Sequence, residues 1–133
     1  MIRECTAEDL PDILNMAKCF HAGWCTGELD LDRAQELITQ ITSLGIALRT
    51  DNGFIGGVVM PHPFTGHSVL VELAWWSADK TGIQLFNRFI EAGKELGVTE
   101  IRMSTMGTSS KTVAKIIQRK GFTVAETQYS LTL

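Results

Sequence analysis

The stretch that decides the fold is Val69-Leu70-Val71-Glu72-Leu73-Ala74-Trp75-Trp76. Its side chains are apolar at both alternating sets of positions, which predicts a strand buried on both faces in the middle of a sheet. Glu72 is the exception, because a carboxylate inside such a strand costs free energy unless it is paired or functional. Its two interpretations are a reactive group and a structural carboxylate held by a buried arginine or by backbone donors.

The segments on either side of this strand alternate between helical and strand patterns. Leu10, Ile13, Leu14 and Ala17 recur at helical spacing, and Asp51-Asn52-Gly53 between two apolar runs is a strong hairpin signal. The order therefore predicts an α/β (α+β) domain in which a hairpin region precedes a strand-helix-strand unit, so the sheet is mixed. The predicted strands are 2–5, 46–49, 54–60, 68–76, 98–105 and a final strand or hairpin over 121–133, and the predicted helices are 7–20, 30–44, 81–96 and 110–120.

Composition and charge narrow the class of protein. The chain has 133 residues, 44% of them hydrophobic, and its 12 Lys and Arg against 15 Asp and Glu give a formal charge of −3. This length fits one domain over residues 1–133, and the mild acidity gives no electrostatic footprint for nucleic acid. No run has the length and apolarity of a membrane helix or a signal peptide. We therefore expect a soluble, cytoplasmic protein.

The cysteines and histidines do not predict a metal site. Cys5, Cys19 and Cys25 cannot all pair within one chain, and none lies in a CxxC spacing, so reduced thiols are expected. His21 lies close to Cys19 and Cys25 in the sequence, but a zinc site needs three or four convergent ligands. We expect no bound metal.

Three segments resemble the GNAT superfamily of N-acyltransferases. Gly56-Gly57-Val58-Val59 is similar to the family's third strand, and Glu72–Trp76 with the helix after it is similar to the fourth strand and cofactor helix. Ile116–Phe122 is similar to a late helix that ends in Lys-Gly-Phe, and Glu126 and Tyr129 follow it. No single piece is specific, so the spacing of all three carries the resemblance. The Glu-x-x-Trp-Trp and Glu-x-x-Tyr patterns are most similar to small GNAT-like proteins of bacteriophages.

The resemblance implies a GNAT-like mixed, mostly antiparallel sheet of six or seven strands with about four helices on its two faces. It also implies transfer of an acetyl group from acetyl-CoA to a primary amine of a small molecule or a protein. Glu72 is then the general base, with a pKa raised by partial burial, and Tyr129 or Ser110 protonates the leaving thiolate. The implied CoA-binding residues are Ala74, Trp75, Trp76, Lys80, Thr81, Gly82, Ile83 and Ser110.

Two departures from the family pattern weigh against catalysis. The phosphate loop within Ser77–Gln84 is short and holds one glycine, Gly82, while Asp79 would repel a diphosphate. The late helix has Ile117 where many members have a tyrosine, and isoleucine cannot donate a proton. The alternative hypothesis is therefore a non-catalytic GNAT-like binding or structural protein, encoded by a phage.

The acceptor and the assembly are the least determined features. Trp24, between the first two predicted helices, and Trp76 are the candidate substrate-binding residues, and plain core packing is the alternative for each indole. The expected partners are an acyl-CoA and an amine, with neither nucleic acid nor membrane. A homodimer formed by exposed C-terminal strands is a further hypothesis, and a phage-encoded protein would act in the host cytoplasm.

Overall fold

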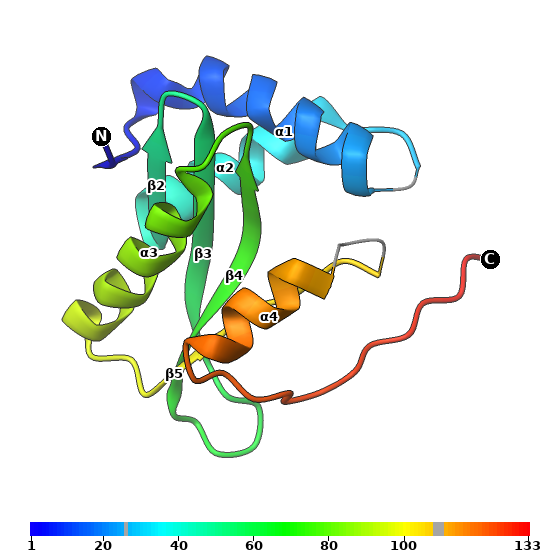
Figure 1. Ribbon diagram of the computed structural model, residues 1–133. Helices are drawn as coiled ribbons and strands as arrows, with labels where there is room; N and C mark the ends of the chain where they lie inside the picture. Colours follow the sequence, from blue (N-terminus) through cyan, green and yellow to red (C-terminus); the bar gives the residue numbers. More distant parts are fainter. Residues whose placement is uncertain (26, 108–110) are drawn as a thin grey trace.

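The computed structural model describes the chain except residues 26 and 108–110 and the side chain of Trp24. Its strands form one sheet in the order β1-β2-β3-β4-β5, antiparallel throughout except for the parallel pair β4–β5 (Figure 1). The strands are β1 (Arg3–Glu4), β2 (Ile46–Thr50), β3 (Gly53–Pro61), β4 (Ser68–Ser77) and β5 (Glu100–Arg102), and the helices are the 3₁₀ turn η1 (Ala7–Asp9), α1 (Leu10–Trp24), α2 (Leu31–Leu44), α3 (Gly82–Leu96) and α4 (Lys111–Arg119).

Helices cover both faces of the sheet, as the doubly apolar β4 predicts. On one face Ile13 of α1 and Ile41 of α2 pack with Phe54 of β3 in one buried cluster. On the other face α3 places Leu85 and Phe89 against the sheet, and α4 joins α3 through a third cluster around Phe86 and Ile117. These three clusters form the core, and β4 runs between the two helical layers. Among the residues that the structure describes, no helix is long and apolar enough to cross a membrane.

Local signals in the sequence account for the helix ends. Asp9 accepts a hydrogen bond from the Thr6 backbone N–H at 2.8 Å, which completes a capping box at the start of η1, the turn that leads into α1. Asp30 caps α2 by accepting from the Arg33 N–H at 3.1 Å. Gly97 ends α3 in the left-handed region, with φ of +77°, where a residue without Cβ fits best.

The expectation of six or seven strands is wrong for the described chain, which has five. The predicted hairpin at Asp51–Gly53 is present, but residues 123–133 contain no strand. The predicted strand 98–105 is also shortened to Glu100–Arg102. Because β5 pairs over only three residues, it offers too short an edge to order the whole C-terminal segment beside it.

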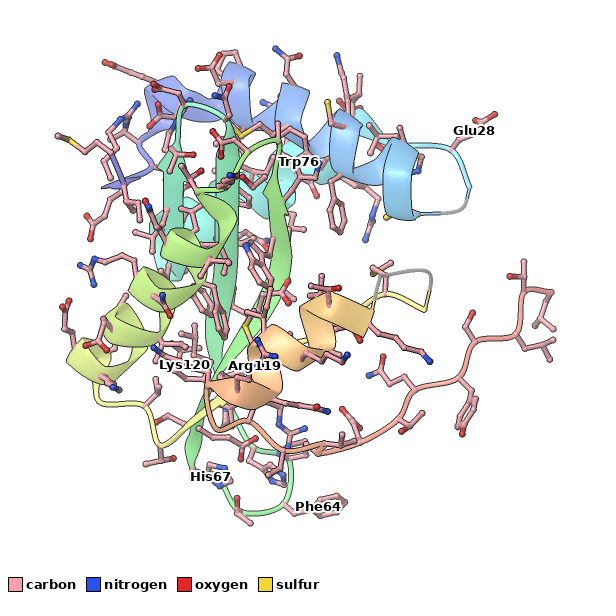
Figure 2. The ribbon with its side chains drawn as sticks, in the orientation of Figure 1. Glu28, Phe64, His67, Trp76, Arg119 and Lys120 are labelled. Carbon is pink, nitrogen blue, oxygen red and sulfur yellow. The ribbon has the colours of Figure 1, made fainter. Side chains whose placement is uncertain are left out.

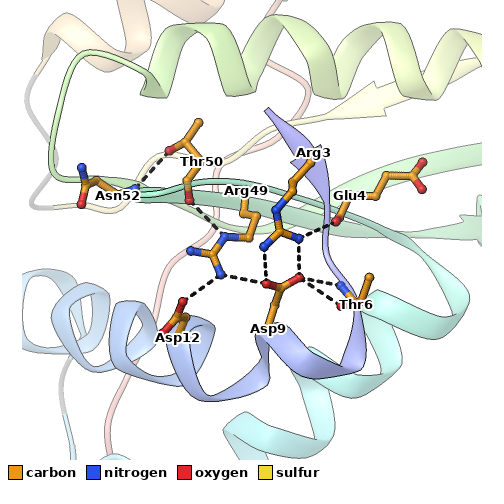
Figure 3. Close-up of polar contacts among 8 residues, drawn as sticks. All are labelled: Arg3, Glu4, Thr6, Asp9, Asp12, Arg49, Thr50 and Asn52. Atoms are coloured by element: carbon orange, nitrogen blue, oxygen red, sulfur yellow. Dashed lines mark hydrogen bonds and ion pairs between the residues drawn. The ribbon is translucent and has the colours of Figure 1, made fainter. Parts of the chain in front are cut away.

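A buried ionic network joins the N-terminal elements to the sheet (Figure 3). Asp9 Oδ1 accepts hydrogen bonds from Arg3 at 2.6 Å and from Arg49 at 3.0 Å, and Arg49 also contacts Asp12 Oδ2 at 3.1 Å. Asp9 and Arg49 are both nearly inaccessible to solvent. The Arg3 hydrogen bonds, helped by the Thr6 N–H, hold the pKa of Asp9 well below its usual range. The network therefore fixes η1 and α1 against β1 and β2.

Asp9→Ala should lower the free energy of unfolding by about 3–5 kcal/mol, because it leaves the buried Arg49 guanidinium without its main counter-charge. Asp12→Ala is the matched control. Asp12 also contacts Arg49, but its side chain is 66% exposed, so we expect a loss below about 1 kcal/mol. Urea unfolding followed by circular dichroism measures both losses, and equal losses would contradict a buried charge at Arg49.

Candidate active site

The candidate site begins where β4 and β5 separate. The parallel pairing of β4 with β5 runs from Val69 opposite Glu100 to Val71 opposite Arg102, and it ends at that last pair. β4 continues to Ser77 with β3 as its only strand neighbour in the described chain. The backbone of β4 beyond Val71 is therefore without a strand partner on the β5 side. We call this parting of the strands the fork.

A bulge lies at the same level of the sheet. Gly56 pairs with Ala74 and Gly57 pairs with Glu72, so Leu73 is an extra residue on β4 with no partner on β3. An extra residue of this kind bends its strand and increases the local twist. The bulge therefore accompanies the turning of β4 away from β5.

Glycine at position 57 permits the close packing that this geometry requires. A Cβ atom there would lie 2.3 Å from the Val71 carbonyl oxygen and 2.9 Å from the Phe89 ring. Both distances are far inside van der Waals contact. Gly57 is thus explained by packing beside the fork, whereas a Cβ at Gly56 would lie 2.7 Å from the Phe54 ring and 2.9 Å from Ile41 Cγ2.

Glu72 lies at the fork, with 8% of its surface exposed. Its Oε1 accepts a hydrogen bond from the Ser104 backbone N–H at 3.2 Å, which spans the two diverging strands. Burial raises the pKa of Glu72 to about 7, although the Ser104 hydrogen bond acts in the opposite direction. A carboxyl group with this pKa exchanges protons readily near neutral pH, as general acid-base chemistry requires.

The two tryptophans after Glu72 point to opposite faces of the sheet. Trp75 Nε1 donates to the Gly82 carbonyl oxygen at 3.0 Å, and its ring stacks on Phe86 with centroids 5.2 Å apart. Trp76 pairs with Phe54 of β3 and packs against the cluster beneath α1 and α2. Both indoles therefore take part in core packing. This leaves the β4 main chain, rather than these rings, as the part that faces the fork.

The loop between β4 and α3 is closed by its own carboxylate. Asp79 Oδ1 accepts from the Thr81 N–H and from the Ser77 hydroxyl, both at 3.0 Å, and Asn52 Nδ2 donates to Asp79 Oδ2 at 3.3 Å. The Thr81 side-chain hydrogen bond is the largest of several that lower the pKa of Asp79 to about 2. An ionised carboxylate therefore lies at the start of α3, where the resemblance implies a diphosphate.

The remaining loop residues are partly open to solvent. Lys80 is exposed, Ile83 is 49% exposed, and Thr81 Oγ1 lies 3.1 Å from Thr50 Oγ1 of β2. A Cβ at Gly82 would lie 3.1 Å from the Ser77 Cβ, which is a tight contact. The structure therefore groups the predicted loop residues at the N-terminal end of α3, on the same side of the sheet as Trp75.

Other predicted residues lie apart from the fork or outside the description. Ser110 and the side chain of Trp24 fall outside the described parts of the chain. Tyr129 is 92% exposed in the segment that follows α4, whereas Ile117 is 8% exposed in the α3–α4 core. Figure 2 shows Trp76 at one end of β4 and His67 at the turn beyond the other end.

Sequence reasoning did not identify the partners that hold this site in place. Ser104 supplies the hydrogen bond to Glu72, Asn52 reaches Asp79, and Thr50 reaches Thr81. The Asp-Asn-Gly hairpin signal located the turn that carries Asn52, but a turn pattern does not specify a contact with a distant loop. Long-range polar contacts of this kind leave no periodic signal.

One cavity in the described chain lies away from the fork. This cavity, of about 230 Å³, lies at the opposite edge of the sheet, where Cys5, Ala47 and Glu95 are among the lining residues. Within the described residues, no group of three or more His, Cys, Asp or Glu side chains is placed to hold a metal ion. The candidate site is defined by Glu72 and by the β4 main chain beside it.

Comparison with known proteins identifies the fold. No protein-family model matches the sequence, and no curated protein matches it. Among solved structures, the ribosomal-protein-alanine N-acetyltransferase from Brucella melitensis biovar Abortus 2308 has a TM-score of 0.74 at 14% identity, covering 100% of this chain and 99% of that chain. An acetyltransferase from Trypanosoma brucei has a TM-score of 0.70 at 15% identity, with the same coverage of 100% and 99%.

A third similar structure carries a different description. The transcriptional regulator from Bacillus halodurans C-125 has a TM-score of 0.73 at 17% identity, covering 100% of this chain and 99% of that chain. At these identities the likeness establishes the fold and not the reaction. The GNAT fold expected from the sequence is confirmed.

Glu72→Gln should remove a pH dependence of stability. Because the folded pKa of about 7 exceeds the ordinary value of 4.5, folding favours protonated Glu72. Wild-type stability should therefore fall as pH rises from about 4.5 to 7, by up to about 3 kcal/mol from this group. The measurement is the free energy of unfolding in urea at several pH values, compared between wild type and Glu72→Gln.

Glu91→Gln is the matched control, because it removes an exposed carboxylate from α3. Its stability should follow the wild-type curve across this pH range. A Glu72→Gln curve that also runs parallel to wild type would show that Glu72 titrates normally.

Proposed function

We propose that this protein is an N-acetyltransferase that moves the acetyl group of acetyl-CoA to a primary amine of a small molecule or a protein. The observation that carries the proposal is Glu72, a buried carboxyl group with a pKa of about 7 at the fork. Acetyltransferases with the same fold support it. The expected location is the cytoplasm.

In the proposed reaction Glu72 takes a proton from the ammonium form of the acceptor. The free amine attacks the thioester carbonyl carbon, forming the C–N bond, and the nitrogen then loses its surplus proton to solvent. The tetrahedral intermediate collapses with cleavage of the C–S bond, and exchange with solvent restores Glu72 and the proton donor to their starting states. Backbone N–H groups of Ala74–Trp76 stabilise the developing oxyanion. The departing thiolate takes a proton from Ser110 or Tyr129. For Tyr129 this requires a movement of its segment, because the side chain is 92% exposed.

The proposed CoA site extends from the fork to the start of α3. Ala74, Trp75 and Trp76 would hold the pantetheine through their main chain, because β4 has no described strand partner on that side. Lys80, Thr81, Gly82 and Ile83 would meet the phosphates, and Ser110 would lie beside the pantetheine arm. Asp79 opposes this binding, since its carboxylate already accepts from the Thr81 N–H. We therefore expect weak affinity for CoA.

A second candidate function is a non-catalytic GNAT-like binding or structural protein, encoded by a phage. The closed loop at Asp79 and the burial of Ile117 in the α3–α4 core favour it. The candidate acceptor residues Trp24 and Trp76 would then serve packing alone. The two functions differ in CoA binding and in thiol release, which one set of variants can separate.

Asp79→Asn should tighten acetyl-CoA binding about fivefold, because it removes a negative charge from the helix end that would meet the diphosphate. Gly82→Glu should abolish binding by adding a charge and bulk at the same place. Asp32→Asn, in the first turn of α2, is the matched control and should bind as wild type does. Isothermal titration calorimetry measures all four proteins.

Thiol release from acetyl-CoA with a panel of primary amines then tests the reaction. Wild type should release CoA thiol, and Glu72→Gln should lose at least about 100-fold in rate. Binding with no thiol release from any amine would favour the binding protein. No binding by wild type or Asp79→Asn up to millimolar concentration would contradict the acetyltransferase.

A further inference from the structure

The cavity beside β2 lies where the strand β1 ends. β1 pairs with Leu48 and Arg49 alone, and one further hydrogen bond, from the Cys5 N–H to the Ala47 carbonyl oxygen, continues it. The outer edge of β2 before Ala47 therefore has no strand neighbour in the described chain. The ends of α2 and α3 close the cavity from two sides, and half of its ten lining residues are aliphatic: Ile46, Ala47, Leu48, Ala92 and Leu96.

Two carboxylates give this apolar cavity a negative charge. Glu4 and Glu95 are exposed residues that line it. The Glu4 carboxylate has no ion pair within the described chain, and Figure 3 shows it pointing away from the network around Asp9. Glu95 meets Arg88 through Oε1 alone, at 3.3 Å. None of the described residues that line the cavity is basic, so its own walls leave this charge uncompensated.

The Cys5 thiol is a buried polar group in the same wall. Its residue is 9% exposed, and the thiol has no hydrogen-bond partner in the described part of the chain. Burial is the largest influence that raises the pKa of Cys5 to about 11, so the thiol is neutral at physiological pH. A neutral thiol is a weak donor and a weak acceptor. The wall therefore offers a polar contact without adding charge.

We infer that this cavity binds a small aliphatic ammonium ion. Carboxylates at its rim can accept charge-assisted hydrogen bonds from the ammonium group, while the aliphatic wall covers the alkyl chain. Each molecule of liquid water occupies about 30 Å³, so a volume of about 230 Å³ holds roughly eight non-hydrogen atoms. A short alkylamine is of this size.

The lining disfavours other classes of ligand. A hard metal cation prefers oxygen ligands on all sides, whereas half of this lining is aliphatic. Quaternary ammonium ions are recognised by aromatic rings, and no aromatic residue is among the described residues that line the cavity. An anion would meet two carboxylates and no cation. A protonated primary amine satisfies both the charge and the apolar wall.

This site is separate from the fork. It lies on the outer side of β2, whereas Glu72 belongs to β4, and β3 runs between these two strands. Two strand spacings amount to about 10 Å, which is too far for direct proton transfer from a bound ammonium ion to Glu72. The inference therefore goes beyond the proposed acetyl transfer and does not depend on it.

1-Aminopentane tests the inference, with 1-pentanol as an uncharged ligand that has the same number of non-hydrogen atoms. Nuclear magnetic resonance shifts of the Ala47 and Ala92 amides measure both titrations at pH 7. The amine should bind saturably, and the alcohol should bind at least about fivefold more weakly because it makes no charge-assisted hydrogen bond. Equal affinities, or no saturation by the amine up to tens of millimolar, would overturn the inference.

Carboxylate variants test which groups hold the ammonium ion. Glu4→Gln and Glu95→Gln should each weaken amine binding at least about fivefold and leave alcohol binding unchanged. Glu91→Gln is the matched control, because Glu91 lies one turn earlier on α3, pairs with Lys94 and does not line the cavity. Equal weakening by Glu91→Gln would indicate a diffuse acidic surface and overturn the inference.

Glu72→Gln separates this site from the proposed acceptor site. It should bind the amine as wild type does, because Glu72 does not line the cavity. Loss of the Ala47 and Ala92 shifts in Glu72→Gln would place the amine at the fork and overturn the inference. Amine binding without acetyl transfer would leave the inference standing, whereas acetyl transfer without these shifts would overturn it and leave the proposed function intact.

Discussion

The separation of β4 from β5 is the constraint on which the candidate site depends. Parallel pairing stops after Val71 and Arg102, and the unpaired Leu73 bends β4 at the same level. A carboxyl group next to this position is only 8% exposed, yet it lies beside main chain that has no strand partner on the β5 side in the described chain. Glu72 therefore combines burial, one hydrogen bond from Ser104 and a pKa near neutrality.

The two ends of the candidate site differ in how well they suit acyl transfer. At the fork, the buried Glu72 has the protonation equilibrium that a general base needs. At the start of α3, Asp79 is ionised and takes the Thr81 N–H that a phosphate oxygen would otherwise accept. For the proposed acetyl transfer, electrostatics would therefore favour the chemical step while opposing the binding of acetyl-CoA. The two candidate functions differ in what they require of these two ends. An acetyltransferase needs Glu72 as a base and an open diphosphate site, whereas a binding protein needs Glu72 only as a structural group.

The sequence predicted most of the fold because its strongest signals are local or periodic. The double-sided apolar pattern around Glu72 correctly predicted a strand between two helical layers, and the Asp51–Gly53 turn correctly predicted a hairpin. The predicted C-terminal strand is absent from the described chain. The alternation of apolar and polar residues around Tyr129 and Leu131 gives a tendency to form a strand, but it does not supply a strand to pair with. Pairing also needs an edge, and β5 provides three residues.

The polar contacts of the site were less predictable for a related reason. Asp79 was recognised as an obstacle to phosphate binding from its charge and position, but its hydrogen bonds to Ser77, Thr81 and Asn52 depend on how distant loops meet. The burial of Glu72 could be predicted from its apolar neighbours in the strand. Its hydrogen bond from Ser104 could not, because that contact depends on how β4 and β5 separate. Periodicity specifies which face a side chain occupies, and the three-dimensional fold specifies what it meets there.

The central claim is that the fork holds a carboxyl group that titrates near neutrality. The Ser104 backbone amide donates to Glu72 at 3.2 Å, so its nuclear magnetic resonance shift reports the protonation of this group directly. A pH titration should give that amide a midpoint near 7, and the midpoint should vanish in Glu72→Gln. A midpoint near the ordinary glutamate value of 4.5 would contradict the account, because Glu72 would then be neither desolvated nor poised to exchange a proton at neutral pH.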